Sequence, residues 1–262
     1  MDPGDHKLYH VHGFDSRKVL DTYMSDEEGK TFGDDALIFP MKKIHSIFVQ
    51  GHITGDSLID ISMGSFIHHL YPAYDFFKEV TLLRVSEGCV MELNKWLNTR
   101  TDAFDWAHTA RMLAEITGDS DQDLEKDVRL KAAIKRIMKC DLQEENLTDP
   151  EILPLADCVI TAGLLDIISE DLKAYAKNLK KISNLLKPGG HLMLLGSVNA
   201  TYMMVGEEKI HVLKYDESHA RKALTDLGFT IDHCEVHNRK AESHLINYEG
   251  VIFIAAHKKK LR

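Results

Sequence analysis

The sequence predicts an α/β protein in which helices cover both faces of a mostly parallel sheet. From about residue 51 onward, short apolar runs typical of strands alternate with longer segments of helical periodicity. The last two apolar runs follow one another after the final helical segment, which indicates two closing strands. The 262 residues suffice for one large α/β unit that buries about seven-tenths of the surface exposed by the unfolded chain.

The first 50 residues differ from the rest of the chain. Residues 7–50 are polar and charged, and apolar side chains recur there at helical spacing, as at Val19, Leu20 and Tyr23. We therefore expect an N-terminal helical cap at 1–50, followed by the α/β domain at 51–262.

Strand-like and helix-like segments alternate through the first half of the α/β domain. We expect strands at 57–61, 80–85 and 110–114, and helices at 65–74, 91–98 and 130–138. An acidic stretch at 119–127 lies before the last of these helices.

The second half carries stronger signals. The continuous apolar run at 157–162 is typical of a strand buried on both faces. A helix is expected at 169–186, opened by Ser169 as N-cap and ended by the Lys-Pro-Gly-Gly segment at 187–190. The remaining elements are strands at 191–195, 229–236 and 251–257, and a helix at 217–227.

Composition and charge exclude several classes of function. A formal net charge of −9 opposes binding to a nucleic-acid backbone. The four cysteines have no Cys-x-x-Cys spacing and are expected to be free thiols in a reducing compartment. The N-terminus has no basic and apolar leader, and no apolar run reaches the length of a membrane span. We expect a cytoplasmic protein without membrane or nucleic-acid partners, and leave open its oligomeric state and release without a signal peptide.

Nine segments in one order resemble the small-molecule N-methyltransferase family that includes the nicotinamide, indolethylamine and phenylethanolamine N-methyltransferases. The anchors are FDSRKVLDTY (14–23), GDSLIDI (55–61), ELNKWL (92–97), AFDWAH (103–108), KCDL (139–142), ADCVITAGLLD (156–166), LLKPGGHL (185–192), YMMVGEEK (202–209) and NYEGVIF (247–253). The resemblance implies a Rossmann-like class I methyltransferase fold, with a mostly parallel seven-stranded sheet and an N-terminal helical extension. It also implies S-adenosylmethionine as the cofactor.

The first loop departs from the family pattern. The resemblance implies Asp-Ile-Gly-Ser-Gly-Pro after the first strand, where glycines let the backbone approach the cofactor. This chain has Asp60-Ile61-Ser62-Met63-Gly64-Ser65. We expect the side chains of Ser62 and Met63 to occupy space that the family gives to the ligand.

Arg84 is the second departure. The family carries an aspartate at this position, and its carboxylate accepts hydrogen bonds from the ribose hydroxyls. Arginine has no acceptor, and its positive charge opposes a sulfonium cofactor. A lost charge-assisted hydrogen bond costs about 1.5 to 3 kcal/mol, so we expect cofactor binding to be weak or lost.

Other positions complete the candidate site. The resemblance assigns Tyr23, Cys89, Asp141 and Leu142 to the cofactor, with Cys89 replacing the usual Asn and Asp141 facing the adenine amine. It assigns five residues to the substrate pocket: Val19, Met24, Gly196, Tyr202 and Asn247. Gly196 replaces a family acid, Val19 and Met24 replace other family residues, and His68 stands where a tyrosine is usual.

Three functions follow from these residues. The first is a non-catalytic or impaired N-methyltransferase homologue, retained as a structural, storage or small-molecule-binding protein. The alternative is an active S-adenosylmethionine-dependent N-methyltransferase acting on an aromatic or heteroaromatic amine. A third is a binder of a phosphorylated nucleotide, which Arg84 would contact. The partner that these functions allow is a small molecule, for which the ancestral cofactor cleft is the expected site.

We assign no catalytic nucleophile and no metal ligands from the sequence. His10-x-His12 and His68-His69 lack cysteine or acidic partners at ligand spacing. No Gly-x-Ser-x-Gly elbow is present.

Overall fold

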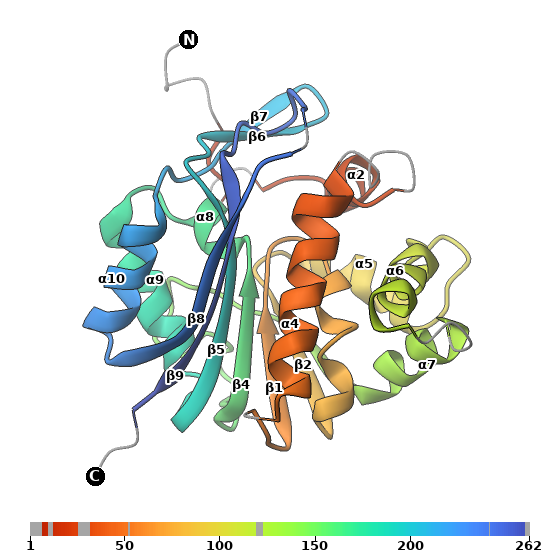
Figure 1. Ribbon diagram of the computed structural model, residues 1–262. Helices are drawn as coiled ribbons and strands as arrows, with labels where there is room; N and C mark the ends of the chain where they lie inside the picture. The colour runs from red at the N-terminus through yellow and green to blue at the C-terminus, as the bar shows by residue number, and fades with distance from the viewer. Residues whose placement is uncertain are drawn as a thin grey trace.

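The computed structural model describes residues 7–9, 13–25, 32–51, 53–118, 123–240 and 242–259. Within them, a seven-stranded sheet has the order β3-β2-β1-β4-β5-β9-β8 (Figure 1). The first five strands of that order are parallel, and β9 is antiparallel to both β5 and β8. The strands are β1 (Ser57–Ile61), β2 (Glu79–Arg84), β3 (Ile134–Lys139), β4 (Ala156–Ala162), β5 (Leu186–Val198), β8 (Phe229–Asn238) and β9 (Gly250–Lys258).

Helices cover this sheet, and a small hairpin stands above its upper edge in Figure 1. The helices are α2 (Ser16–Tyr23), α4 (Phe39–Val49), α5 (Glu87–Leu97), α6 (Ala107–Thr117), α7 (Asp123–Ala133), α8 (Leu164–Ile168), α9 (Leu172–Ser183) and α10 (Glu217–Asp226). A π-helical segment, η2 (Gly33–Ile38), leads directly into α4. The hairpin consists of β6 (Tyr202–Val205) and β7 (Glu208–His211). None of the helices in the described ranges is long and apolar enough to cross a membrane.

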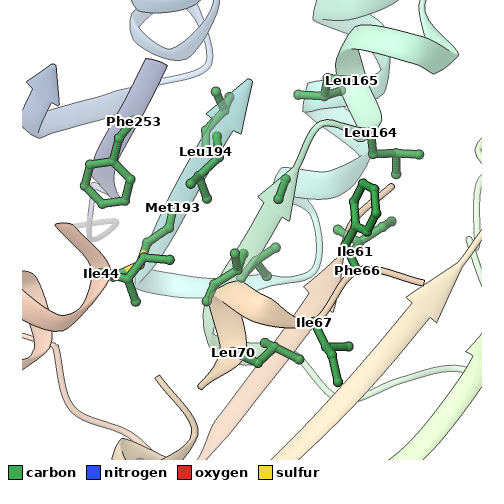
Figure 2. Packing of buried hydrophobic residues seen from close by; sticks show 14 of the residues in the cluster. Ile44, Ile61, Phe66, Ile67, Leu70, Leu164, Leu165, Met193, Leu194 and Phe253 are labelled. Carbon is green, nitrogen blue, oxygen red and sulfur yellow. The ribbon is translucent and has the colours of Figure 1, made fainter. Parts of the chain in front are cut away.

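The core forms where α4 packs on the sheet. Figure 2 shows Ile44 of α4 beside Met193 of β5, with Phe253 of β9 nearby. All three side chains are fully buried. The central strand β4 is mostly apolar and is buried at every position except Asp157, because layers cover both of its faces.

The fold class predicted from the sequence is confirmed. β1 begins and ends at the predicted residues, and β2 is displaced by one residue. The predicted segments at 157–162, 217–227, 229–236 and 251–257 correspond to β4, α10, β8 and β9 with small changes at their ends. Within the N-terminal 50 residues, α2, η2 and α4 are helical as expected.

Two predicted elements are wrong in type. Residues 110–114 are the middle of α6 and not a strand, and their buried side chains Ala110, Leu113 and Ala114 follow helical spacing. Residues 134–138 form β3 and not the end of a helix. β3 is an edge strand with charged, exposed side chains, so its alternation of apolar residues is too weak to identify.

The helix predicted at 65–74 is also wrong, and some boundaries differ from the prediction. Residues 65–74 contain no α-helix, only the short 3₁₀ helix His68–Leu70 and the start of another at Tyr74–Phe76. The helix expected from Ser169 begins at Leu172, because the Asp171 carboxylate accepts a hydrogen bond from the Ala174 N–H at 2.7 Å. It ends at Ser183, before the Lys-Pro-Gly-Gly segment, which lies within β5. Neither α8 nor the β6-β7 hairpin was predicted.

Replacing Phe253 by alanine tests this core. Its side chain is fully buried in the central layer, so Phe253→Ala should lower the free energy of unfolding by about 3 to 5 kcal/mol. Chemical denaturation followed by circular dichroism measures the change. The matched control is Val128→Ala, because Val128 is 64 % exposed and should change stability by no more than about 0.5 kcal/mol. Equal effects of the two variants would contradict the assignment of the core.

Candidate cofactor and acceptor site

The first loop, residues 62–64, follows β1 at the carboxyl end of the parallel strands. This edge is where open α/β sheets bind ligands. Gly64 has a φ of +57°, and the Phe14 ring packs against it. The hydroxyls of Ser16 and Ser65 lie 2.5 Å apart, so α2 is tied to the segment that follows the loop.

Arg84 forms a buried ion pair with Asp60. Both side chains are completely inaccessible to solvent, and Arg84 Nη2 lies 2.6 Å from Asp60 Oδ2. The guanidinium also donates to the main-chain oxygens of Leu83, Phe66 and Asp60 at 2.8, 2.9 and 3.2 Å. The charge of Arg84 is therefore neutralised beneath the loop. This differs from our expectation, which placed the charge in the cofactor cleft.

Asp60 has further partners. Its Oδ1 lies 2.7 Å from His69 Nε2 and accepts a hydrogen bond from the Ser62 hydroxyl at 2.6 Å. Burial by itself raises the pKa of Asp60, but Arg84, His69 and Ser62 outweigh it and lower the pKa to about 2. Asp60 is therefore ionised at neutral pH.

Ser62 links this network to the next strand. Its hydroxyl accepts a hydrogen bond from the Ala162 N–H at 3.0 Å, at the end of β4. Ser62 is almost fully buried, so its hydroxyl faces the protein interior. Met63 instead packs against Gly163, where an added Cβ would lie 3.5 Å from the Met63 side chain.

A polar cavity of about 570 Å³ lies on one side of this edge. It is lined by Tyr9, Gly13, Val85, Ser86, Lys139, Cys140, Asp141, Leu142, Gln143, Ile168 and Glu170. Two of the predicted cofactor residues, Asp141 and Leu142, are among them. The loop that carries them is fixed by Lys181 of α9, whose buried ammonium donates to the oxygens of Leu142, Gln143 and Glu144 at 2.8 to 3.0 Å.

An apolar cavity of about 110 Å³ is lined by a different set of residues. They are Tyr23, Met24, Phe32, Ala36, Met63, Phe66, Gly163, Asp166, Ile167, Ser197, Met203, Val212, Ile246, Tyr248 and Val251. Tyr23, Met24 and Met63 are sequence-predicted site residues. The walls are mainly apolar, and Asp166 is the one acid among these lining residues.

Asp166 is a candidate functional residue that the sequence analysis missed. Its carboxylate accepts hydrogen bonds from the Ser197 N–H at 2.6 Å and from the Tyr215 hydroxyl at 2.9 Å. Burial raises the pKa of Asp166 to about 7, although both hydrogen bonds oppose the shift. An acid in an apolar cavity with a pKa near neutrality is typical of a functional group. Its position soon after a buried strand is the signal that could have identified it.

Gly196 lies directly beneath this acid. A Cβ at Gly196 would lie 2.1 Å from the Tyr215 hydroxyl and 2.8 Å from Asp166 Oδ1. The space into which a side chain at 196 would extend is therefore filled by Asp166 and Tyr215. Gly196 does not enlarge the pocket; it admits these two side chains.

Two predicted residues bond to the main chain of other segments. The Tyr23 hydroxyl donates to the main-chain oxygens of Met204 and Leu245. Asn247 holds the turn before β6, because its side-chain oxygen accepts from the Thr201 N–H at 2.8 Å. Neither cavity is lined by the predicted residues Val19, Ser62, Gly64, Arg84, Cys89, Gly196, Tyr202 or Asn247.

The paired histidines 68 and 69 belong to the interior. Their ring planes are at 90° to each other, and both side chains are buried. Burial lowers the pKa of His68 well below its usual value. His69 contacts Ser62 and Asp60 through the same ring nitrogen, Nε2, so the three residues do not form a nucleophilic triad. His10 and His12 lie outside the described residues.

The strand order, with β9 antiparallel between β5 and β8, is that of a class I methyltransferase fold. Similar solved structures include a S-adenosylmethionine-dependent methyltransferase from Methanosarcina mazei, with a TM-score of 0.55 and 15% identity over 82% of this chain and 98% of that one. Another is an N-methyltransferase from Bradyrhizobium japonicum in complex with S-adenosyl-L-homocysteine, with a TM-score of 0.54 and 11% identity over 93% and 98% of the two chains.

The model of the NNMT/PNMT/TEMT family matches residues 5–259. The chain is 33% identical to rabbit (Oryctolagus cuniculus) indolethylamine N-methyltransferase, over 93% of this chain and 92% of that protein. It is 31% identical to nicotinamide N-methyltransferase of Homo sapiens, over 94% and 93% of the two chains. The chain belongs to the NNMT/PNMT/TEMT family, and its relatives are N-methyltransferases.

The ion pair beneath the loop predicts strong coupling between its members. Asp60→Asn and Arg84→Met should each destabilise the protein by about 3 to 5 kcal/mol, because each leaves a buried charge without its main partner. The double variant should lose less than the sum of the two. Urea denaturation of the four proteins measures the coupling. The control Asp56→Asn, which breaks an exposed ion pair with Lys78, should have little effect on stability. If the stability losses of the two buried substitutions simply add in the double variant, the pairing is contradicted.

Asp166 predicts a pH-dependent contribution to stability. Its pKa is about 7 in the folded protein and 3.8 in an ordinary environment. Its stabilising contribution is therefore complete below about pH 4 and is lost as the pH rises through 7. The stability of the wild type relative to Asp166→Asn should fall by up to about 4 kcal/mol between pH 4 and pH 7.5. Denaturation across this pH range measures the stability difference between the two proteins. The control is the exposed substitution Asp226→Asn. A stability difference between wild type and Asp166→Asn that stays constant with pH would contradict the raised pKa of Asp166.

Proposed function

We propose that this chain is an N-methyltransferase homologue with an impaired cofactor step, which retains a binding site for a small aromatic amine. The observation that carries the proposal is the ion pair between Arg84 and Asp60. The position that supplies a ribose-binding carboxylate in the family here supplies a buried cation, already bonded to Asp60 and three main-chain oxygens. Arg84 cannot accept hydrogen bonds from ribose.

The two ends of S-adenosylmethionine meet different conditions in this chain. The polar cavity, whose lining includes Asp141 and Leu142, supports binding of the adenine end, and Lys181 holds the main-chain oxygen of Leu142. At the ribose end, the aligned position holds no acceptor, and Met63 of the first loop packs against Gly163. Loss of the charged hydrogen bonds alone corresponds to about 1.5 to 3 kcal/mol, or about 10- to 150-fold in affinity.

The apolar cavity supports binding of an amine with a single aromatic ring. Its volume of about 110 Å³ approaches the roughly 150 Å³ of a cavity known to bind benzene. The Asp166 carboxyl at its wall can pair with a cationic nitrogen, and that pairing would favour the ionised carboxylate. The chemistry expected of the ligand is thus an aromatic ring with a basic or cationic nitrogen.

The second candidate is an active S-adenosylmethionine-dependent N-methyltransferase. The polar cavity and Asp166 favour it, since an acid beside the acceptor cavity could orient an amine. Methyl transfer depends mainly on alignment of the acceptor with the methyl group. In that case the cofactor would have to bind without the usual ribose acceptor.

Calorimetric titration distinguishes the two candidates. Binding of S-adenosylmethionine and S-adenosylhomocysteine should be at least about tenfold weaker than that of human nicotinamide N-methyltransferase measured alongside. Transfer of labelled methyl to nicotinamide and tryptamine should not exceed background. Met63→Ser should strengthen cofactor binding, whereas Met91→Ser, an exposed control in α5, should not.

The amine site is tested separately. A panel of single-ring aromatic amines should raise the Tm of the wild type, and Asp166→Asn should abolish the shift while Asp226→Asn leaves it intact. Cofactor affinity equal to the human enzyme, with turnover, would overturn the proposal in favour of the active enzyme. No shift with any amine would overturn the ligand-binding part.

A further inference from the structure

Three potential metal ligands meet at the opposite end of the sheet from the candidate site. His191 lies in the amino-terminal half of β5, and β5 runs parallel to β4 with His191 opposite Cys158. His257 is directly opposite His191 on the antiparallel strand β9. Asp232 is on β8, the outer neighbour of β9. The nearest of them in sequence are 25 residues apart, and the sheet register brings them together.

The geometry of these side chains suits a shared ion. One ligand atom from each of His191, Asp232 and His257 lies within 4.8 Å of the other two. Asp232 presents both carboxylate oxygens to His257 Nδ1 at 2.9 Å. Ligands about 2.1 Å from one tetrahedral Zn²⁺ lie about 3.4 Å apart, so small side-chain rotations would complete the set.

A β-bulge turns Asp232 toward the histidines. The register between β8 and β9 shifts between Ile231 and His233, so that one extra residue stands opposite the partner strand. Asp232 and His233 consequently line one cavity of about 520 Å³ together with His191, His257 and Ala255. Bulges recur beside functional sites because they redirect a side chain in this way.

The electrostatic surroundings favour a cation. Helix α4 ends at this cavity through Ser46 and Gln50, and a helix C-terminus carries a partial negative charge.

Other charged groups near the cavity have partners of their own. Lys43 of α4 is paired with Glu235 at 2.5 Å, and Glu235 lies 3.4 Å from His233 Nε2. Lys187, which shares an adjoining cavity with His191 and His257, is paired with Asp157 at 2.8 Å. Each of these lysines is therefore held by a carboxylate other than Asp232.

We propose that His191, Asp232 and His257 form a binding site for a divalent transition metal, with Zn²⁺ as the best match. Two imidazoles and one carboxylate are the ligand set of a zinc site with an open position for water. Both histidine side chains are partly exposed and Asp232 more so, which gives an ion direct access from solvent. The site is independent of the cofactor and acceptor cavities.

A second histidine-aspartate pair provides the matched control. His219 Nδ1 lies 2.7 Å from Asp216 Oδ1 on the surface at the start of α10. Among the described residues, no second histidine joins that pair in a metal-binding cluster. It therefore reproduces the histidine-aspartate contact without the three-ligand arrangement.

The experiment uses the untagged full chain, with Zn²⁺ and Co²⁺ as probes. Calorimetry should give one Zn²⁺ per chain, and Co²⁺ should produce the visible absorption of a low-coordinate site. His191→Gln, His257→Gln and Asp232→Asn should each weaken binding by about tenfold or more, whereas His219→Gln should not. Circular dichroism establishes whether each variant is folded. If a histidine variant does not fold, Asp232→Asn still tests the site, because Asp232 is the most exposed of the three ligands.

The result would support the site if stoichiometric binding depends on all three ligands and Zn²⁺ raises the Tm of the wild type but not of Asp232→Asn. The proposed metal site would be overturned if Zn²⁺ fails to bind, if the three variants bind Zn²⁺ like the wild type, or if His219→Gln weakens binding equally.

Discussion

The ion pair between Asp60 and Arg84 fixes the edge of the sheet on which the candidate site is built. It joins the carboxyl ends of β1 and β2, and through Ser62 and His69 it extends to β4 and to the segment after the first loop. Because both charges are fully buried, each is stable only in the presence of the other. The first loop is thus fastened from beneath by charged and polar side chains.

This constraint separates the two halves of the site. The polar cavity with Asp141 and the apolar cavity with Asp166 do not contain the ion pair in their walls, so either can bind a ligand while the ion pair stays intact. Arg84, which the resemblance aligns with a family aspartate, lies in the wall of neither cavity. Membership of an N-methyltransferase family establishes the scaffold, whereas activity depends on the residues of the site.

The sequence predicted the buried central strands well, but it predicted the edge strand β3 and the helix α6 poorly. β1 and β4 are mostly apolar and are buried along nearly their whole length, which makes their pattern easy to recognise. β3 at the edge and the buried face of α6 were misassigned, since a short apolar run fits a strand or a helix until its neighbours are known. The resemblance located Asp141 and the first loop, but it supplied no reason to select Asp166.

The sequence by itself determined the fold class, the family resemblance and the exchange of an acid for Arg84, because these depend on local pattern and on residue identity. Only the tertiary structure decided where the charge of Arg84 lies, that Asp166 fills the space above Gly196, and that His191, Asp232 and His257 meet. Those facts depend on strand register and on packing between segments distant in the chain. A linear sequence specifies the side chains, and the paired sheet decides which of them share one space.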